Sequence, residues 1–140
     1  MRQQYTLDLA DAQRAVDAAV REATRDQRPM AVAVADVHGD VICALRMDGA
    51  HARVLRHAVR KAYTAAVMQR NTLVFKKDLQ ARDGNLDEWG DSQLTTLQGG
   101  KVVVVDGQVV GAVAVGGNTL QRDEQIAEIA VQAIRGEDST

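Results

Sequence analysis

The sequence predicts an α+β domain in which two β-hairpins form one antiparallel sheet and helices pack on it. Residues 30–45 and 101–117 each contain two Val- and Ala-rich runs joined by a turn that is too short for a crossover helix. Longer segments on either side of these hairpins have apolar residues at helical spacing. The order helix, hairpin, helices, hairpin, helix contains no βαβ unit, so we expect a single antiparallel sheet.

Length and composition are those of one ordinary globular domain. The 140 residues suit a single domain, which we expect to span 1–140. Because 46% of the residues are hydrophobic and only 3% are aromatic, the core must consist of Val, Ala, Leu and Ile. The net charge is −2, with acidic and basic residues interleaved, whereas a nucleic-acid partner requires a concentrated basic surface. We therefore expect no nucleic-acid partner.

The single cysteine and the first residues of the sequence are those expected of a cytoplasmic protein. Cys43 lies within a predicted strand, where a lone thiol behaves as a small hydrophobe, and one cysteine excludes an internal disulfide. Met1–Tyr5 lacks the apolar stretch of a signal peptide. No apolar run approaches the roughly 20 residues that span a bilayer. We expect a cytoplasmic protein that has no membrane partner.

The first half of the chain is expected to form a helix and a hairpin. Thr6 or Asp8 can cap the first helix, which Arg28-Pro29 ends. Residues 30–37 alternate Ala with Val, so one face of this strand carries only small side chains and can lie close under a helix. A turn at 38–40 leads into a second strand over 41–45.

The second half is expected to form three helices around the second hairpin. The second helix runs from His51 to about Met68, and Thr72 can cap a short third helix that reaches about Arg82. A polar loop follows, in which Trp89 is either a lid over a ligand or an anchor for the loop. Asp-Gly at 106–107 is a strong hairpin signal, and the last helix is expected over 120–134.

Several ordered motifs resemble those of a known family. They are "VAVADVHGDVICALRMDGA", "RKAYTAA", "GGKVVVVDGQVVGAVAVGG" and "DEQIA". Together they resemble the GlcG/HbpS-like heme-binding family, which includes the C-terminal domain of PduO, over about residues 7–134. The resemblance implies a profilin-like fold, a homo-oligomer and heme as a candidate cofactor. In PduO-type members a histidine of the first helix is thought to ligate heme, but residues 7–27 of this chain contain no histidine.

His51 is therefore the leading candidate for a metal ligand or a catalytic proton carrier. It begins the second helix in register with buried Leu55, so its imidazole is expected to point toward the buried side. Arg46 and Met47 precede it and can face the same cleft. The alternative is a structural histidine hydrogen-bonded to Asp48 or to backbone.

Lys61 and Asp123 are two further charged residues that are candidates for the functional site. Lys61 lies in the family's Lys-Ala-x-Thr-Ala motif, where its stem can line a pocket and hold an anionic group; the alternative is a salt bridge between helices or subunits. Asp123 precedes Ile126 and Ala130 on one helical stripe and is expected to face inward. It is a candidate general base or metal ligand, and the alternative is stabilisation of the helix end.

Two glycine-containing segments are expected to complete the ligand-binding site. Gly116 and Gly117 lie between a strand and a helix N-terminus, where backbone N–H groups can bind an anion. The family resemblance, rather than spacing, places Gln98, Gly99 and Gly100 at the pocket. Paired glycines allow a backbone to approach a ligand closely, although they serve a tight turn equally well.

Three functions remain open from the sequence. The first is a small-ligand binding protein, with His51 or Met47 as the axial contact to heme iron and Lys61 or Arg46 beside the propionates. The second is a cofactor-free enzyme for a small carboxylate or carbonyl metabolite, in which His51 or Asp123 transfers protons. The third is a structural or chaperone-like subunit of an oligomer. The first two require His51 and Gly117 to share one cavity.

Overall fold

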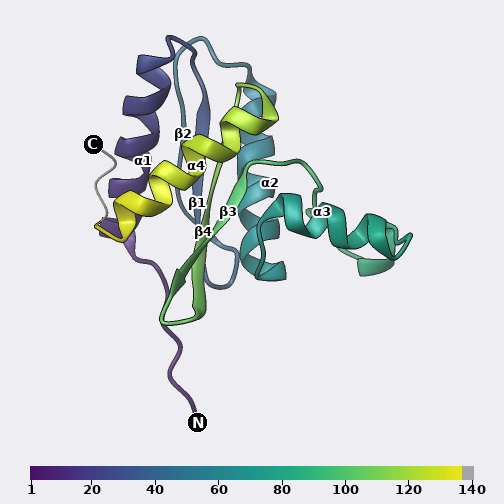
Figure 1. The fold of residues 1–140 in the computed structure, drawn as a ribbon. Coiled ribbons are helices and arrows are strands. Elements are labelled where there is room, and N and C mark those ends of the chain that lie inside the picture. The colour runs from purple at the N-terminus through teal and green to yellow at the C-terminus, as the bar shows by residue number, and fades with distance from the viewer. Residues whose placement is uncertain (137–140) are drawn as a thin grey trace.

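The computed structural model describes residues 1–136, and within them four antiparallel strands form a sheet with helices on both faces (Figure 1). The elements are α1 (Leu9–Arg25), β1 (Ala31–Asp36), β2 (Val41–Arg46), α2 (Ala52–Met68), α3 (Thr72–Ala81), the 3-10 turn η1 (Leu86–Trp89), β3 (Gly100–Val105), β4 (Gln108–Gly116) and α4 (Leu120–Ile134). The predicted α+β class is confirmed.

The sheet order is β2-β1-β4-β3, so the two predicted hairpins join through their inner strands β1 and β4. These two strands are antiparallel, with Ala31 opposite Gly116 and Asp36 opposite Gly111. The residues that precede β1 therefore lie beside the residues that follow β4. This one pairing creates the candidate site described below.

The two faces of the sheet differ in side-chain size. Valines of β1 and β4, such as Val32 and Val113, pack with α1 and α4 into one buried cluster. Alanines of the same strands, such as Ala33 and Ala112, pack on the other face against Ala58 of α2 and its neighbours. Figure 1 shows α1 and α4 on one side of the sheet and α2 on the other. Small side chains on both surfaces let α2 approach closely, as the Ala/Val alternation predicts.

Helix ends follow the expected capping chemistry with one difference. Asp8 caps α1 and forms a reciprocal capping box with Asp11. Thr72, expected as a cap, is instead the first residue of α3, and Asn71 holds the N-cap position. The Thr72 hydroxyl is used elsewhere, because it accepts a hydrogen bond of 3.0 Å from the Gly100 backbone N–H at the start of β3.

Residues 71–91, here called the arm, contain α3 and η1 and extend away from the sheet (Figure 1). Phe75 packs edge-on against Trp89, with ring centroids 6.2 Å apart. Trp89 is therefore an anchor for its own loop, which is one of the two roles that its sequence position left open. None of the helices between residues 1 and 136 combines the length and the apolar character that crossing a membrane requires.

Candidate functional site

His51 and Gly117 line the same surface cleft, which has a volume of about 190 Å³. The other lining residues are Arg28, Pro29, Gly49, Ala50 and Val54. We call this hollow the His51 cleft. The residues that follow β2 and those that follow β4 thus meet at one end of the sheet, as the leading sequence hypotheses require.

The pairing of β1 with β4 forms the backbone wall of the cleft. Gly117 has a φ of +121°, and a Cβ atom there would lie 3.0 Å from the Pro29 carbonyl oxygen and the Met30 Cα. Only glycine fits this combination of positive φ and close approach. The Arg28 Nε donates a hydrogen bond of 3.1 Å to the Gly117 carbonyl, which ties the two segments together.

His51 is exposed, so the expectation that its imidazole points toward the buried side is wrong. The residue is the N-cap of α2 and has extended backbone angles, φ −64° and ψ 144°. Because an N-cap residue is not helical, the register of Leu55 and Ala58 does not extend back to it. Its side chain does not cap the helix either, which leaves the ring at the mouth of the cleft.

Lys61 and Asp123 form a buried ion pair behind this cleft. Lys61 Nζ lies 3.6 Å from Asp123 Oδ2 and donates a hydrogen bond of 2.9 Å to the Val115 carbonyl. The two residues are only 2% and 1% exposed. Asp123 Oδ1 accepts a hydrogen bond of 2.9 Å from the Asn118 backbone N–H, directly after cleft residue Gly117. The pair thus supports the turn that forms one wall of the cleft.

Burial controls the electrostatics of the pair. Burial lowers the pKa of the Lys61 ammonium, while the nearby Asp123 carboxylate opposes that change. Burial likewise raises the pKa of the Asp123 carboxyl, against the opposing effects of Lys61 and the Asn118 N–H. The charge of each side chain is balanced by the opposite charge of its partner. The salt bridge between helices, which was the alternative role for Lys61, is the one its geometry supports.

Gly99 and Gly100 pack against protein atoms. A Cβ atom on Gly99 would lie 2.8 Å from both Lys61 Nζ and the Val115 carbonyl, and one on Gly100 would lie 2.6 Å from the Lys61 carbonyl. A Cβ atom on Gly116 would lie 3.0 Å from the Val54 carbonyl of α2. These three glycines allow the strands to approach α2.

The remaining candidate residues divide between surface and core. Gln98 Nε2 donates a hydrogen bond of 2.9 Å to Glu124 Oε2. Arg46 is exposed at the end of β2. Met47 is half-buried against the valine-face cluster, and its backbone N–H donates to the Met30 carbonyl. The structure therefore separates the predicted single cavity into an open cleft and a buried ion pair.

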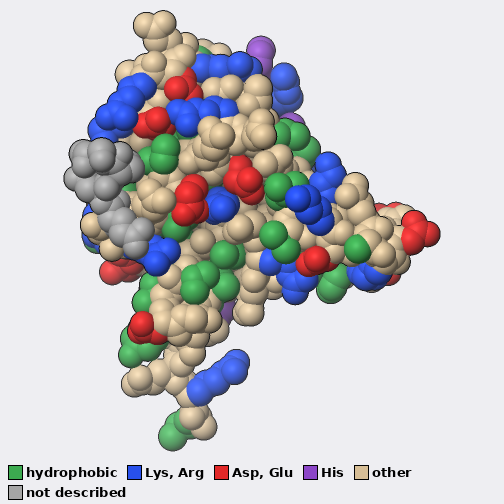
Figure 2. All heavy atoms as spheres, viewed as in Figure 1, with side chains coloured by type: hydrophobic (Ala, Val, Ile, Leu, Met, Phe, Trp, Pro, Cys, Tyr) green, Lys and Arg blue, Asp and Glu red, His purple; other side chains and the backbone are tan. Residues whose placement is uncertain are grey.

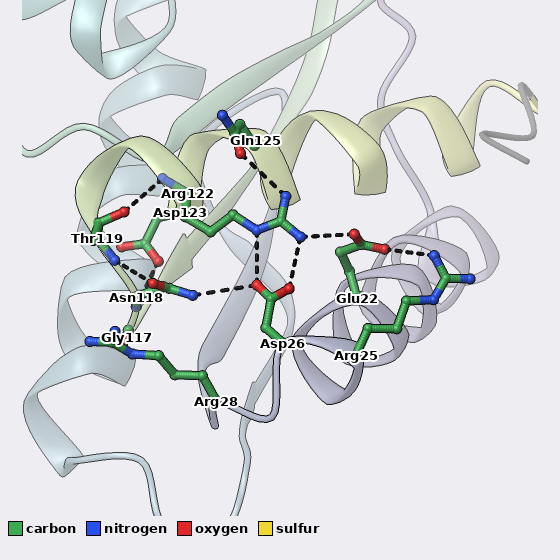
Figure 3. A network of polar contacts seen from close by, with 10 residues as sticks. All are labelled: Glu22, Arg25, Asp26, Arg28, Gly117, Asn118, Thr119, Arg122, Asp123 and Gln125. Atoms are coloured by element: carbon green, nitrogen blue, oxygen red, sulfur yellow. Dashed lines mark hydrogen bonds and ion pairs between the residues drawn. The ribbon is translucent and has the colours of Figure 1, made fainter.

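An ion-pair network holds the other side of the Gly117–Thr119 turn (Figure 3). Arg122, in the first turn of α4, bonds through Nε to Asp26 at 2.8 Å and through Nη2 to Glu22 at 2.8 Å. Hydrogen bonds from Arg122 lower the pKa of Asp26. Asn118 Nδ2 donates to the same Asp26 carboxylate at 3.4 Å. The network fixes the end of α1 to the start of α4.

Sequence reasoning missed Arg28, Pro29 and Val54 as cleft residues. Arg28-Pro29 was interpreted only as the end of a helix, and its place beside Gly117 depends on the β1–β4 pairing, which periodicity does not indicate. Among the described residues, 1–136, no group of three or more His, Cys, Asp or Glu side chains is arranged to hold a metal ion.

The sheet, its two helical layers and the His51 cleft define a small α+β protein with an open surface cleft at one end of the sheet. The family model described as "Haem degrading protein HbpS-like" matches residues 7–132, and the chain belongs to this HbpS-like family. The resemblance seen in the sequence motifs is thereby confirmed.

Individual relatives are similar over most of the chain. Protein GlcG of Escherichia coli K12 is 32% identical over 115 residues, which are 82% of this chain and 84% of GlcG. The corrinoid adenosyltransferase PduO of Salmonella typhimurium is 29% identical over 130 residues, 91% of this chain. This chain spans only 39% of the length of PduO.

Solved structures are similar in fold. A Klebsiella pneumoniae protein named ORFY has a TM-score of 0.88 at 27% identity, with 96% of this chain and 94% of that chain covered. A double mutant of Streptomyces reticuli HbpS has a TM-score of 0.84 at 32% identity, and the match covers 94% of this chain and 88% of that chain. A complex of PduOC with heme has a TM-score of 0.82 at 27% identity and covers 91% and 94%.

Proposed function

We propose that this chain is a small-ligand binding protein whose ligand is heme, held at the His51 cleft. The observation that carries the proposal is the state of His51. Its imidazole is exposed at the mouth of the cleft and has no hydrogen-bond partner within residues 1–136. A free imidazole nitrogen is a common ligand for heme iron. The heme complex of the similar PduOC structure supports the choice of ligand.

The volume of the cleft limits how much of a porphyrin it could enclose. Its volume of about 190 Å³ is below the range of roughly 300–1,000 Å³ that encloses small ligands. The cleft alone would therefore not enclose a porphyrin, and the group that it would offer to the iron is His51 at its mouth. The residues present fit this open, surface-ligated arrangement, and a second copy of the chain would be needed to enclose the ring.

The cation that would neutralise the heme propionates is Arg28. Lys61 is already committed to Asp123, and its ammonium is shielded from solvent. Arg28 lines the cleft, and within residues 1–136 the hydrogen bond that its side chain makes is the one from Nε to the Gly117 carbonyl. Its charge also acts to lower the pKa of the nearby Asp123. Arg46, exposed at the same end of the sheet, remains the second candidate.

His51 is also a better axial ligand than Met47. The Met47 side chain packs partly into the valine-face cluster, where its apolar contacts stabilise the fold. Exposing its sulfur to an iron atom would give up that burial. When bound, heme would supply redox chemistry or a ligand-sensing centre, and His51 would hold its iron.

The cofactor-free enzyme is not favoured by the relatives. It needs an accessible proton carrier, and Asp123, one of the two candidates, is 1% exposed and ion-paired. His51 alone would have to supply the acid–base chemistry. The relatives point to heme instead, through the PduOC complex and the description of the family.

A hemin titration tests the proposal. We expect a Soret band that saturates as hemin is added to the wild-type protein, and we expect His51→Ala to raise the Kd about tenfold. The matched control is His38→Ala, because His38 is exposed at the β1–β2 turn away from the cleft. Absence of saturable binding in the wild type would refute the function. Unchanged binding in His51→Ala would refute only the axial ligand.

Assembly and location complete the proposal. We expect a homo-oligomer, as the family resemblance implies, and a neighbouring copy would supply the missing wall of the small cleft. Sedimentation velocity with and without hemin measures this assembly. The cytoplasmic location expected from the sequence also stays a prediction, which cell fractionation checks.

A further inference from the structure

A second and larger hollow lies on the arm, between α3 and η1. Its floor is apolar and consists of Met68, Phe75, Leu79 and Trp89. Its volume is about 490 Å³, which is within the range that accommodates small organic ligands. We call it the arm groove. It shares no lining residue with the His51 cleft.

The arm groove contains two of the four aromatic residues of the chain. The sequence has one Phe and one Trp, and both line this groove. The Phe75 ring meets the Trp89 ring edge-on, at an interplanar angle of 62°. Phe75 is buried, whereas Trp89 remains 45% exposed. A large exposed ring beside a buried one presents a surface on which a flat aromatic molecule can stack.

Two ion pairs border the groove and leave it without net charge. Arg70 pairs with Asp78 at 2.8 Å, and Arg82 pairs with Glu88. The Arg82 guanidinium also lies over the Trp89 ring, 5.7 Å from its centroid. Figure 2 shows acidic side chains at the tip of the arm as well. An anionic ligand would be repelled by both carboxylates unless it displaced them from their arginines. A cationic ligand would be repelled by both arginines unless it displaced them from their carboxylates.

We infer that the arm groove is a second ligand site and that it takes a small, flat, uncharged aromatic molecule. The apolar floor provides burial, and the exposed part of the Trp89 ring provides an aromatic contact. The Arg–carboxylate pairs at the border leave no net charge that would attract a charged ligand. This inference is independent of heme binding at the His51 cleft.

Two related fluorescent probes test the inference. N-phenyl-1-naphthylamine is uncharged, and 1-anilinonaphthalene-8-sulfonate has the same ring system with a negative charge. Because Trp89 is the single tryptophan, exciting it and recording probe emission by energy transfer detects the bound probe. We expect saturable binding of the uncharged probe, with a Kd about tenfold lower than that of the sulfonate.

Variants locate the probe. Phe75→Leu removes the buried ring, and Met68→Gln places a polar group on the half-buried wall of the groove. Each should raise the Kd of the uncharged probe about tenfold. Val74→Ala is the matched control, because Val74 is exposed on α3 but does not line the groove. Circular dichroism identifies any variant that fails to fold. If Phe75→Leu fails to fold, Met68→Gln decides the test.

Four results would overturn the inference. They are no saturable binding of the uncharged probe, unchanged binding in a folded Met68→Gln variant, tighter binding of the sulfonate, and displacement of the probe by hemin at equal stoichiometry. If the first of these results is found, the sedimentation of Met68→Gln is compared with that of the wild type. A smaller assembly of the variant would assign the groove to a contact between copies of the chain.

Discussion

Lys61 and Asp123, which are 62 positions apart in the sequence, meet with their charged atoms 3.6 Å apart inside the protein. Lys61 comes from α2 and Asp123 from α4, on opposite faces of the sheet, and the Val115 carbonyl of β4 completes the contact. The pair connects all three layers at the end of the sheet where the His51 cleft lies. Its contribution is therefore to hold the wall of the cleft.

Removing one partner of this pair should strongly destabilise the protein. In Lys61→Met the buried Asp123 carboxylate loses its counter-charge, and we expect the free energy of unfolding to fall by about 3–5 kcal/mol. Urea denaturation measures the change. The control is Lys101→Met, because Lys101 pairs with Glu128 at the surface at 3.4 Å, and this change should cost less than about 1 kcal/mol. Equal losses in the two variants would contradict the structural role of the buried pair.

Gly99→Ala should be destabilising for a separate reason. Gly99 has a φ of +130°, and the added methyl group would approach the Lys61 ammonium and the Val115 carbonyl to 2.8 Å. We expect a loss of about 3 kcal/mol, since backbone strain adds to overpacking. Gly90→Ala is the control, because Gly90 also has a positive φ, +66°, but no atom of the described residues lies within 4 Å of its Cβ position. Thermal unfolding of both variants measures the difference, and a loss in Gly90→Ala as large as that in Gly99→Ala would count against this packing.

The Arg122 network should make stability depend on pH in the acid range. Because Arg122 lowers the pKa of Asp26, the network stabilises the folded state above the ordinary pKa of an aspartate, about 3.9. That stabilisation is lost as the pH falls through the lowered pKa of the folded state.

Arg122→Gln should consequently be less stable than the wild type at pH 7. The difference in their free energies of unfolding should decrease steadily below about pH 4. Urea denaturation at a series of pH values follows both proteins. Arg25→Gln is a matched control, because within residues 1–136 the Arg25 side chain pairs with Glu22 of the same helix at 3.2 Å and not with Asp26. This change should leave the profile nearly unchanged. A gap between Arg122→Gln and the wild type that stays constant down to pH 3 would show that Asp26 does not carry the effect.

Most of the fold could be predicted because local sequence signals agree with the tertiary structure. The Ala/Val alternation of 30–37 predicts a strand with one small-residue face, and α2 packs against that face. The Asp-Gly turn at 106–107 predicts the second hairpin. The last helix has the predicted bounds, 120–134, because the Thr119 side chain caps it. Each of these signals lies within a few residues of the structure it predicts.

The site was less predictable because it depends on contacts distant in the sequence. Lys61 and Asp123 were each recognised as candidates, but periodicity does not reveal that they face each other across a sheet. Arg28 enters the His51 cleft only through the pairing of β1 with β4. The helical register gave the wrong orientation for His51, because the side chain of an N-cap residue follows the extended backbone that precedes the helix.

The central claim, that the His51 cleft is the heme site, is tested most directly by mapping a porphyrin onto the backbone. Zinc protoporphyrin keeps the ring and propionates of heme without a paramagnetic iron, and its addition to ¹⁵N-labelled protein can be followed by NMR. We predict that the amide signals of Gly49, His51 and Gly117 shift while those of Phe75 and Trp89 do not. Shifts confined to Phe75 and Trp89, or no shifts in the presence of excess porphyrin, would contradict it.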